Sequence, residues 1–175
     1  VGDLPKYDAQ GKAITYTVKE CYTNPTTSTV QPVNDGAKIT LDGVEYTVTY
    51  QGTAITNTVA RGELTVVKTY TGPAELSGAF QVLVKENGQT VATLTKAEAV
   101  KTGTGTDSDP YTCSWTVRNL LSGRTYTVEE AGTAVEGWTL KSAESTVSVE
   151  HVSTGETAAL HNVYERNQAY LTITK

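Results

Sequence analysis

Three polar side chains, Lys68, Glu130 and Asn162, lie in strand-like runs whose alternation turns them toward an apolar interior. Side chains alternate faces along a strand, so residues two positions apart share a face. An isolated charge on such a face would be very costly, so we expect the three side chains to meet one another. The apolar residues that share their faces are Leu64 and Val66, Tyr126 and Val128, and Leu160 and Tyr164, respectively.

An amine, a carboxyl group and a carboxamide brought together in a dry interior can form a covalent bond. Burial disfavours the charged forms of amines and carboxyl groups, so the pair can exist as neutral amine and neutral acid. Attack by Lys68 on the side-chain carbonyl of Asn162, with Glu130 transferring protons as the catalytic group, would give an amide and release ammonia. This is a single intramolecular turnover, so the chain is not predicted to be an enzyme. The alternative is a buried salt bridge or hydrogen-bonded cluster without covalent chemistry.

The elements that carry these residues recur along the chain. Thr-Tyr-Thr-Val-x-Glu occurs at 15–20 and 125–130, and an apolar-alternating run ending on lysine occurs at 64–68 and 171–175. A third pair, at 54–58 and 159–163, has asparagine as its fourth residue. All three pairs are about 105 to 110 residues apart, which predicts a repeat of domain size.

This repeat divides the chain into three parts. Residues 1–60 are expected to be the C-terminal part of one domain, and 61–167 a complete domain. Residues 168–175 are expected to be the first strand of a further domain or a strand donated to another chain.

An all-β fold is predicted by abundant threonine, valine and tyrosine, with no methionine and one phenylalanine. About seven short strands in roughly 105 residues favour an Ig-like β-sandwich, and the repeat favours such domains in tandem. Tyr16, Tyr126, Tyr164 and Trp138 are expected in the core, and 96–101 is expected to form a short helical turn. The expected strands are 64–70, 78–85, 90–95, 111–118, 124–130, 137–148 and 157–164.

Composition excludes several functional classes. A net charge of −5 without a basic cluster argues against nucleic-acid binding. No apolar run approaches the roughly 20 residues of a membrane-spanning helix, so membrane insertion is not predicted. Cys21 and Cys113 have no partners at metal-ligand spacing, and no metal or other cofactor is predicted. No nucleophile-base-acid set or phosphate loop favours a conventional enzyme.

The segment 4–12 leading into 14–20 resembles the most recognisable part of the Cna-B type domains of Gram-positive collagen adhesins and pilin subunits. The resemblance covers nearly the whole chain. It implies an isopeptide triad of Lys68, Glu130 and Asn162, with Glu20 and Asn57 as the corresponding residues of the first copy. It also implies an extracellular stalk or pilin-like module, in the cell wall or a pilus, whose partners are neighbouring repeats or pilus subunits.

The first copy departs from this pattern because no lysine-bearing first strand precedes Glu20 and Asn57. Two explanations stay open for Lys175, which has the right sequence context. It can react within a further domain of a longer array, which we favour because one strand does not replace a missing half-domain. Alternatively, it can enter the first copy of another molecule and link chains head to tail.

A rival hypothesis is an adhesin that binds a host matrix protein or glycoprotein through its loops. The segments 24–36 and 102–110 are rich in glycine, threonine, proline and aspartate or asparagine, which is typical of exposed loops. The ends of β-sandwiches can present recognition sites on such loops.

Overall fold

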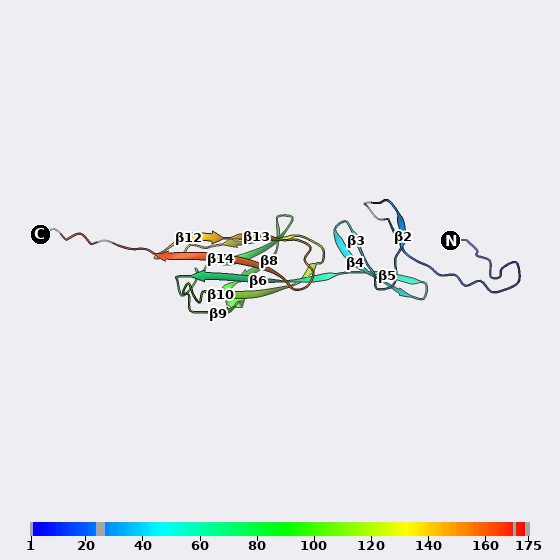
Figure 1. Cartoon of the computed structure of the whole chain (residues 1–175), viewed down its shortest axis with the longest axis horizontal. Coiled ribbons are helices and arrows are strands. Elements are labelled where there is room, and N and C mark those ends of the chain that lie inside the picture. The colour runs from blue at the N-terminus through cyan, green and yellow to red at the C-terminus, as the bar shows by residue number, and fades with distance from the viewer. Residues whose placement is uncertain (1, 24–26, 170, 174–175) are drawn as a thin grey trace.

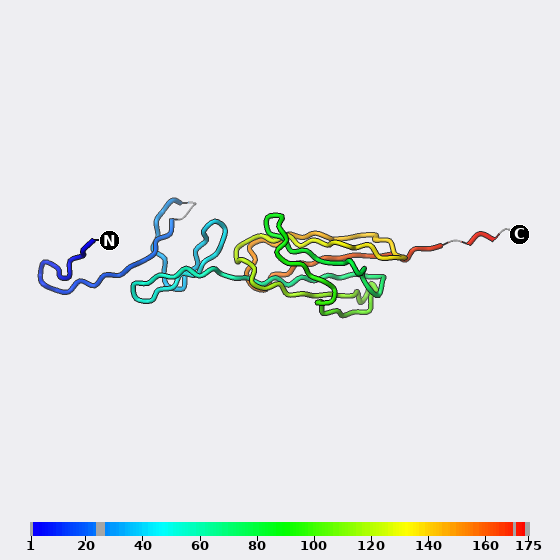
Figure 2. Tube along the Cα trace, turned by 180° about the vertical axis from the view of Figure 1, so that it is seen from behind, coloured from blue at the N-terminus to red at the C-terminus, as the bar shows by residue number. Residues whose placement is uncertain are grey.

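The computed structural model describes residues 2–23, 27–169 and 171–173. Two β-rich units follow one another along the long axis of the molecule, the larger one formed by the later part of the chain (Figure 1). A trace from behind shows the same succession, with the C-terminal segment leading away from the larger unit (Figure 2).

The larger unit is a β-sandwich, which confirms the predicted all-β sandwich fold. A five-stranded sheet has the order β12-β14-β6-β10-β9, and it faces a four-stranded sheet of order β13-β11-β7-β8. Its strands are β6 (Arg61–Thr71), β7 (Gln81–Glu86), β8 (Gln89–Thr95), β9 (Val100–Thr102), β10 (Tyr111–Leu121), β11 (Tyr126–Ala131), β12 (Trp138–Glu144), β13 (Thr146–Val149) and β14 (Glu156–Arg166).

The first and last strands of this sandwich lie side by side. β6 and β14 pair in parallel, with Lys68 opposite Leu160 and Tyr70 opposite Asn162. Every second residue of β6 from Gly62 to Tyr70 is buried, and β14 alternates in the same way from 158 to 164. Side-chain alternation therefore brings the core-facing residues of the two strands onto one surface.

An apolar core fills the space between the two sheets. Trp138 packs against it while staying partly exposed. The Tyr126 hydroxyl accepts a hydrogen bond from the backbone N–H of Leu121 at 2.8 Å, so even its polar end is satisfied inside the core. The buried members are Leu64, Val66, Tyr70, Leu76, Phe80, Val82, Val84, Leu94, Cys113, Trp115, Val117, Leu120, Tyr126, Val128, Val152, Ala158, Leu160 and Tyr164.

The smaller unit has a much smaller core, made by Val33, Ile39 and Val48 with partly buried neighbours. Its three-stranded sheet has the order β3-β4-β5, and β1 pairs with β2. The strands are β1 (Cys21–Thr23), β2 (Val30–Pro32), β3 (Lys38–Leu41), β4 (Val44–Gln51) and β5 (Ala54–Val59).

The segment 14–20 does not form a strand, although its sequence matches β11. Tyr16 is 45% exposed, so its expected place in the core was wrong. Its hydroxyl donates to the Pro5 carbonyl at 2.8 Å within the same stretch of chain. The motif alone does not create a core position, since burial needs a facing sheet to cover it.

The two units are joined by a short, hydrogen-bonded junction. Only Ala60 separates β5 from β6, and its N–H donates to the Glu45 carbonyl at 2.8 Å. Ser122, in the turn after β10, donates its N–H to the Ala60 carbonyl at 3.0 Å and its hydroxyl to the Glu45 carboxylate. The β3–β4 hairpin of one unit is thereby fixed to a turn of the next.

Two local predictions needed correction. The expected strand 137–148 is two strands, because β12 pairs with β14 in one sheet whereas β13 pairs with β11 in the other. The chain crosses between sheets at Ser145, whose carbonyl accepts the Glu130 N–H at 2.9 Å. In the expected helical turn 96–101 only η1 (Lys96–Glu98) is a 3₁₀ helix, and Val100 already begins β9.

Candidate functional site

Lys68, Glu130 and Asn162 meet between the two sheets of the sandwich. Lys68 on β6 and Asn162 on β14 belong to neighbouring strands of one sheet, while Glu130 lies near the end of β11 in the facing sheet. Lys68 and Asn162 are fully buried, as is the side chain of Glu130. Strand alternation thus places an amine, a carboxamide and a carboxyl group in one apolar compartment.

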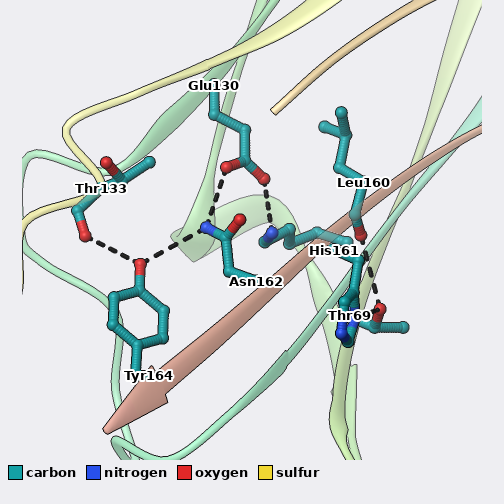
Figure 3. A network of polar contacts seen from close by, with 8 residues as sticks. Thr69, Glu130, Thr133, Leu160, His161, Asn162 and Tyr164 are labelled. Carbon is teal, nitrogen blue, oxygen red and sulfur yellow. Dashed lines mark hydrogen bonds and ion pairs between the residues drawn. The ribbon is translucent and has the colours of Figure 1, made fainter. Parts of the chain in front are cut away.

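The Glu130 carboxylate bridges the other two groups. Its Oε1 lies 2.6 Å from Lys68 Nζ, and its Oε2 accepts a hydrogen bond from Asn162 Nδ2 at 2.9 Å. Figure 3 shows Glu130 reaching toward Asn162 between the strands. Each carboxylate oxygen therefore faces a different nitrogen, so the carboxylate is in contact with both the amine and the carboxamide.

Some polar atoms of the site have no hydrogen-bond partner. Lys68 Nζ and Glu130 Oε1 lie at ion-pair distance but without hydrogen-bond geometry, and Asn162 Oδ1 has no hydrogen-bond partner. An unpaired buried polar atom costs about 1–3 kcal/mol. Lys68 and Glu130 nevertheless form an ion pair, because a charged amine this close to a carboxylate attracts it at any angle.

Burial governs the charge of the lysine. Removal from water lowers the pKa of Lys68 below its usual value of 10.5, and the neighbouring Glu130 opposes this shift. Cys113 and Glu144 oppose it more weakly. A lowered pKa makes the neutral, nucleophilic amine more accessible than in an exposed lysine.

Tyr164 is a neighbour of the triad whose polar role the sequence did not indicate. Its hydroxyl accepts a long hydrogen bond from Asn162 Nδ2 at 3.4 Å and donates to the Thr133 carbonyl at 2.7 Å. The sequence placed Tyr164 in the core as an apolar partner of Asn162. The available signal was its position two residues after Asn162, on the same face of the strand.

Of the second predicted triad, the structure brings together only Glu20 and Asn57 among the described residues. Asn57 Nδ2 donates to Glu20 Oε1 at 3.0 Å, so these two residues meet across the smaller unit. Asn57 is exposed and Glu20 is half-buried. Within the described ranges no lysine is paired with either side chain, and Lys175 lies outside the described residues.

The described residues have neither a metal-binding cluster nor a membrane-spanning helix. Among the residues that the structure describes, no group of three or more histidine, cysteine, aspartate or glutamate side chains could hold a metal ion. The same part of the chain contains no helix that is long and apolar enough to cross a membrane.

Comparison with known proteins gave matches to solved structures alone, since no family model and no curated protein matches the chain. The chain is similar to GBS52, the minor pilin of the Gram-positive pathogen Streptococcus agalactiae, at 13% identity and a TM-score of 0.36, over 87% of this chain and 70% of that one. It is also similar to the pilus-presented adhesin Spy0125 (Cpa), at 29% identity and a TM-score of 0.30, over 58% of this chain and 26% of that one. A cysteine-to-alanine mutant of that adhesin matches at 25% identity and a TM-score of 0.31. These TM-scores are low, so the function of this chain has to be argued from its own residues.

Proposed function

We propose that the chain is a structural stalk or pilin-like module of a Gram-positive cell-surface protein, stabilised by an autocatalytic isopeptide bond between Lys68 and Asn162. Such a module works outside the cell, in the cell wall or a pilus, with neighbouring repeats or pilus subunits as partners. The observation that carries the proposal is the buried Glu130 carboxylate in contact with both reacting nitrogens.

The reaction needs no external reagent. After proton transfer within the ion pair, the neutral Lys68 Nζ attacks Asn162 Cγ, and a new C–N bond forms. The protonated Glu130 delivers its proton to Nδ2 at the Oε2 contact of 2.9 Å, and it then takes one from Nζ at the Oε1 contact of 2.6 Å, so that it ends protonated. The Cγ–Nδ2 bond then breaks and ammonia leaves. Holding the reactants in contact supplies several kcal/mol of the barrier reduction.

The position of the bond suits a load-bearing module. It would connect the first strand of the sandwich, β6, to the last, β14, which are parallel neighbours. Force applied at the two ends of the unit would then pass through the covalent bond instead of pulling β6 away from β14. Closing a loop of about 95 residues stabilises a domain by roughly 4–5 kcal/mol on the loop-entropy account.

Intact mass spectrometry of the purified chain tests the proposal. The wild-type mass is expected to be lower by one ammonia, and Lys68→Ala and Glu130→Ala are expected to have the full mass. Lys101→Ala is the matched control, because Lys101 is partly exposed and its ammonium group pairs with Glu75 and the Ala74 carbonyl. A full, unmodified mass for the wild-type chain would show the proposal to be wrong.

A second candidate function follows from the Glu20–Asn57 hydrogen bond. This pair has the glutamate and asparagine of a triad, so a lysine-bearing strand from elsewhere would complete it. If Lys175 of another molecule supplies that strand, chains become linked head to tail. A denaturing gel is then expected to show a ladder of covalent oligomers that disappears in Lys175→Ala, whereas monomer alone rules this linkage out.

A further inference from the structure

The Asn162 carboxamide donates hydrogen bonds to two side chains, Glu130 and Tyr164. Asn162 Nδ2 donates to Glu130 Oε2 at 2.9 Å and to the Tyr164 hydroxyl at 3.4 Å. Both hydrogens of Nδ2 thus have an acceptor, one on β11 and the other on β14. Figure 3 shows the Tyr164 hydroxyl between Asn162 and Thr133.

Tyr164 can only accept from Asn162, because its single proton is committed elsewhere. The hydroxyl donates to the Thr133 carbonyl at 2.7 Å, a short hydrogen bond. A phenol has one O–H to donate, so the oxygen presents lone pairs to Asn162. An amide turned the other way would place its carbonyl oxygen against this lone pair and against the carboxylate. The favoured orientation is therefore the one in which Nδ2 points toward Glu130 and the Tyr164 hydroxyl.

The loop after β11 fixes the Thr133 carbonyl in this position. Gly132 has a φ of +69°, and a Cβ at Gly132 would lie 2.1 Å from the Ala79 carbonyl oxygen. Only glycine fits this close backbone approach with a positive φ. Glu130 and Thr133 therefore lie close together at the end of β11, where the Glu130 side chain contacts Asn162 and the Thr133 carbonyl accepts from Tyr164.

We propose that Tyr164 is a positioning residue for isopeptide formation: it holds the nitrogen that leaves as ammonia against Glu130 Oε2. This inference rests on the proposed function, since it assigns a role in that same reaction. Without the hydroxyl the carboxamide can rotate, and the nitrogen would spend less time where Glu130 can protonate it. Tyr164 itself exchanges no proton with Asn162 or Lys68.

The test uses the 175-residue chain made by cell-free synthesis, with ammonia loss followed over time by intact mass. Tyr164→Phe removes only the hydroxyl and is expected to slow the loss roughly five- to tenfold, the effect of one hydrogen bond. The matched control is Tyr126→Phe, which removes another buried hydroxyl that bonds to Leu121 instead. That control is expected to react at the wild-type rate.

The pH profile separates positioning from proton transfer. With Tyr164→Phe the rate is expected to fall by the same factor at every pH, while its midpoint stays where wild type has it. A shifted midpoint would mean that the tyrosine exchanges protons, and an unchanged rate would mean that it does not position Asn162. Either result overturns the inference.

A second measurement does not depend on the reaction. In Lys68→Met, which has no amine, the Asn162 side-chain NH₂ is expected to exchange slowly with solvent deuterium by NMR. Adding Tyr164→Phe is expected to speed that exchange and shift the NH₂ resonances, and no change in either would contradict the role of Tyr164. A wild-type chain that never loses ammonia would instead refute the proposed function, while this measurement still tests the hydrogen bond.

Discussion

The same pair of side chains occurs in both units, with nearly the same hydrogen bond but in different surroundings. The asparagine nitrogen lies 2.9 Å from the glutamate in Glu130–Asn162 and 3.0 Å from it in Glu20–Asn57. The first pair has fully buried side chains beside a buried lysine, whereas Asn57 is exposed. Water stabilises charged groups at an exposed site, so the pair there is an ordinary surface hydrogen bond. We therefore expect reactivity to depend on burial and on the neighbouring lysine, and not on the glutamate–asparagine pair alone.

Pulling on single molecules should give the largest contrast, because a covalent bond either holds or is absent. In the wild-type chain the segment between Lys68 and Asn162 is expected not to extend when force is applied at the two ends of the larger unit. In Asn162→Ala the same segment is expected to add about 300 Å on unfolding, from roughly 3.3 Å for each of about 95 residues. Release of that full length by the wild type would contradict the crosslink.

Removing the lysine should destabilise the larger unit strongly. Lys68→Met loses the loop closure, worth roughly 4–5 kcal/mol, and leaves the buried Glu130 carboxyl group without the Lys68 nitrogen that it contacts, which costs about 1–3 kcal/mol more. The unit is expected to stay folded in the cold but to melt at a much lower temperature by calorimetry, since a domain has a typical total of about 5–15 kcal/mol.

Two variants show where that loss comes from. Lys68→Met/Glu130→Gln is expected to recover part of the stability, because it removes the unpartnered ionisable group, although the covalent bond is still missing. Lys141→Met breaks an exposed ion pair with Glu165 and is expected to cost no more than about 1 kcal/mol. Equal effects of Lys68→Met and Lys141→Met would argue against a special role for the buried site.

The pH dependence of stability tests the burial of the lysine directly. In Asn162→Ala no bond can form, and the pKa of Lys68 is lowered below 10.5 in the folded state by burial, against the opposing influence of Glu130, Cys113 and Glu144. Between the folded and unfolded pKa values the unfolded chain binds more protons, so the free energy of unfolding rises with pH there. Above 10.5 this contribution is constant.

Denaturant titrations at several alkaline pH values measure this slope. Asn162→Ala/Lys68→Met is the matched control, and it is expected to lack the rise below pH 10.5. A free energy of unfolding that falls with pH in this window would mean that the folded state favours the charged amine.

Strand alternation was sufficient to predict which faces of β6 and β14 lie inward, because both strands are long and covered by a sheet. The burial of Lys68 and Asn162 follows from this period-2 pattern. The same reasoning was wrong for Tyr16, which is exposed. An alternating pattern specifies a face, but only the presence of a covering layer decides whether that face is buried.

Other features depend on contacts that local sequence does not encode. The crossing at Ser145 splits one alternating run between two sheets, and only the pairing with β11 and β14 shows where it divides. The polar role of Tyr164 depends on the Thr133 carbonyl, which lies 31 residues away along the chain. Tertiary hydrogen bonds of this kind become visible only when the strands are assembled.

The smallest expected effect comes from the exposed pair. Asn57→Ala removes the hydrogen bond to Glu20, and the cost is expected to stay below about 1 kcal/mol because water replaces the lost partner. Intact mass of the monomer is expected to differ from wild type only by the substitution itself, with the ammonia loss at Asn162 preserved. Glu20→Gln is the companion variant, since it keeps the shape and removes the charge. If Asn57→Ala instead regained the mass of one ammonia, the exposed pair would also react, and burial would not be what separates the two sites.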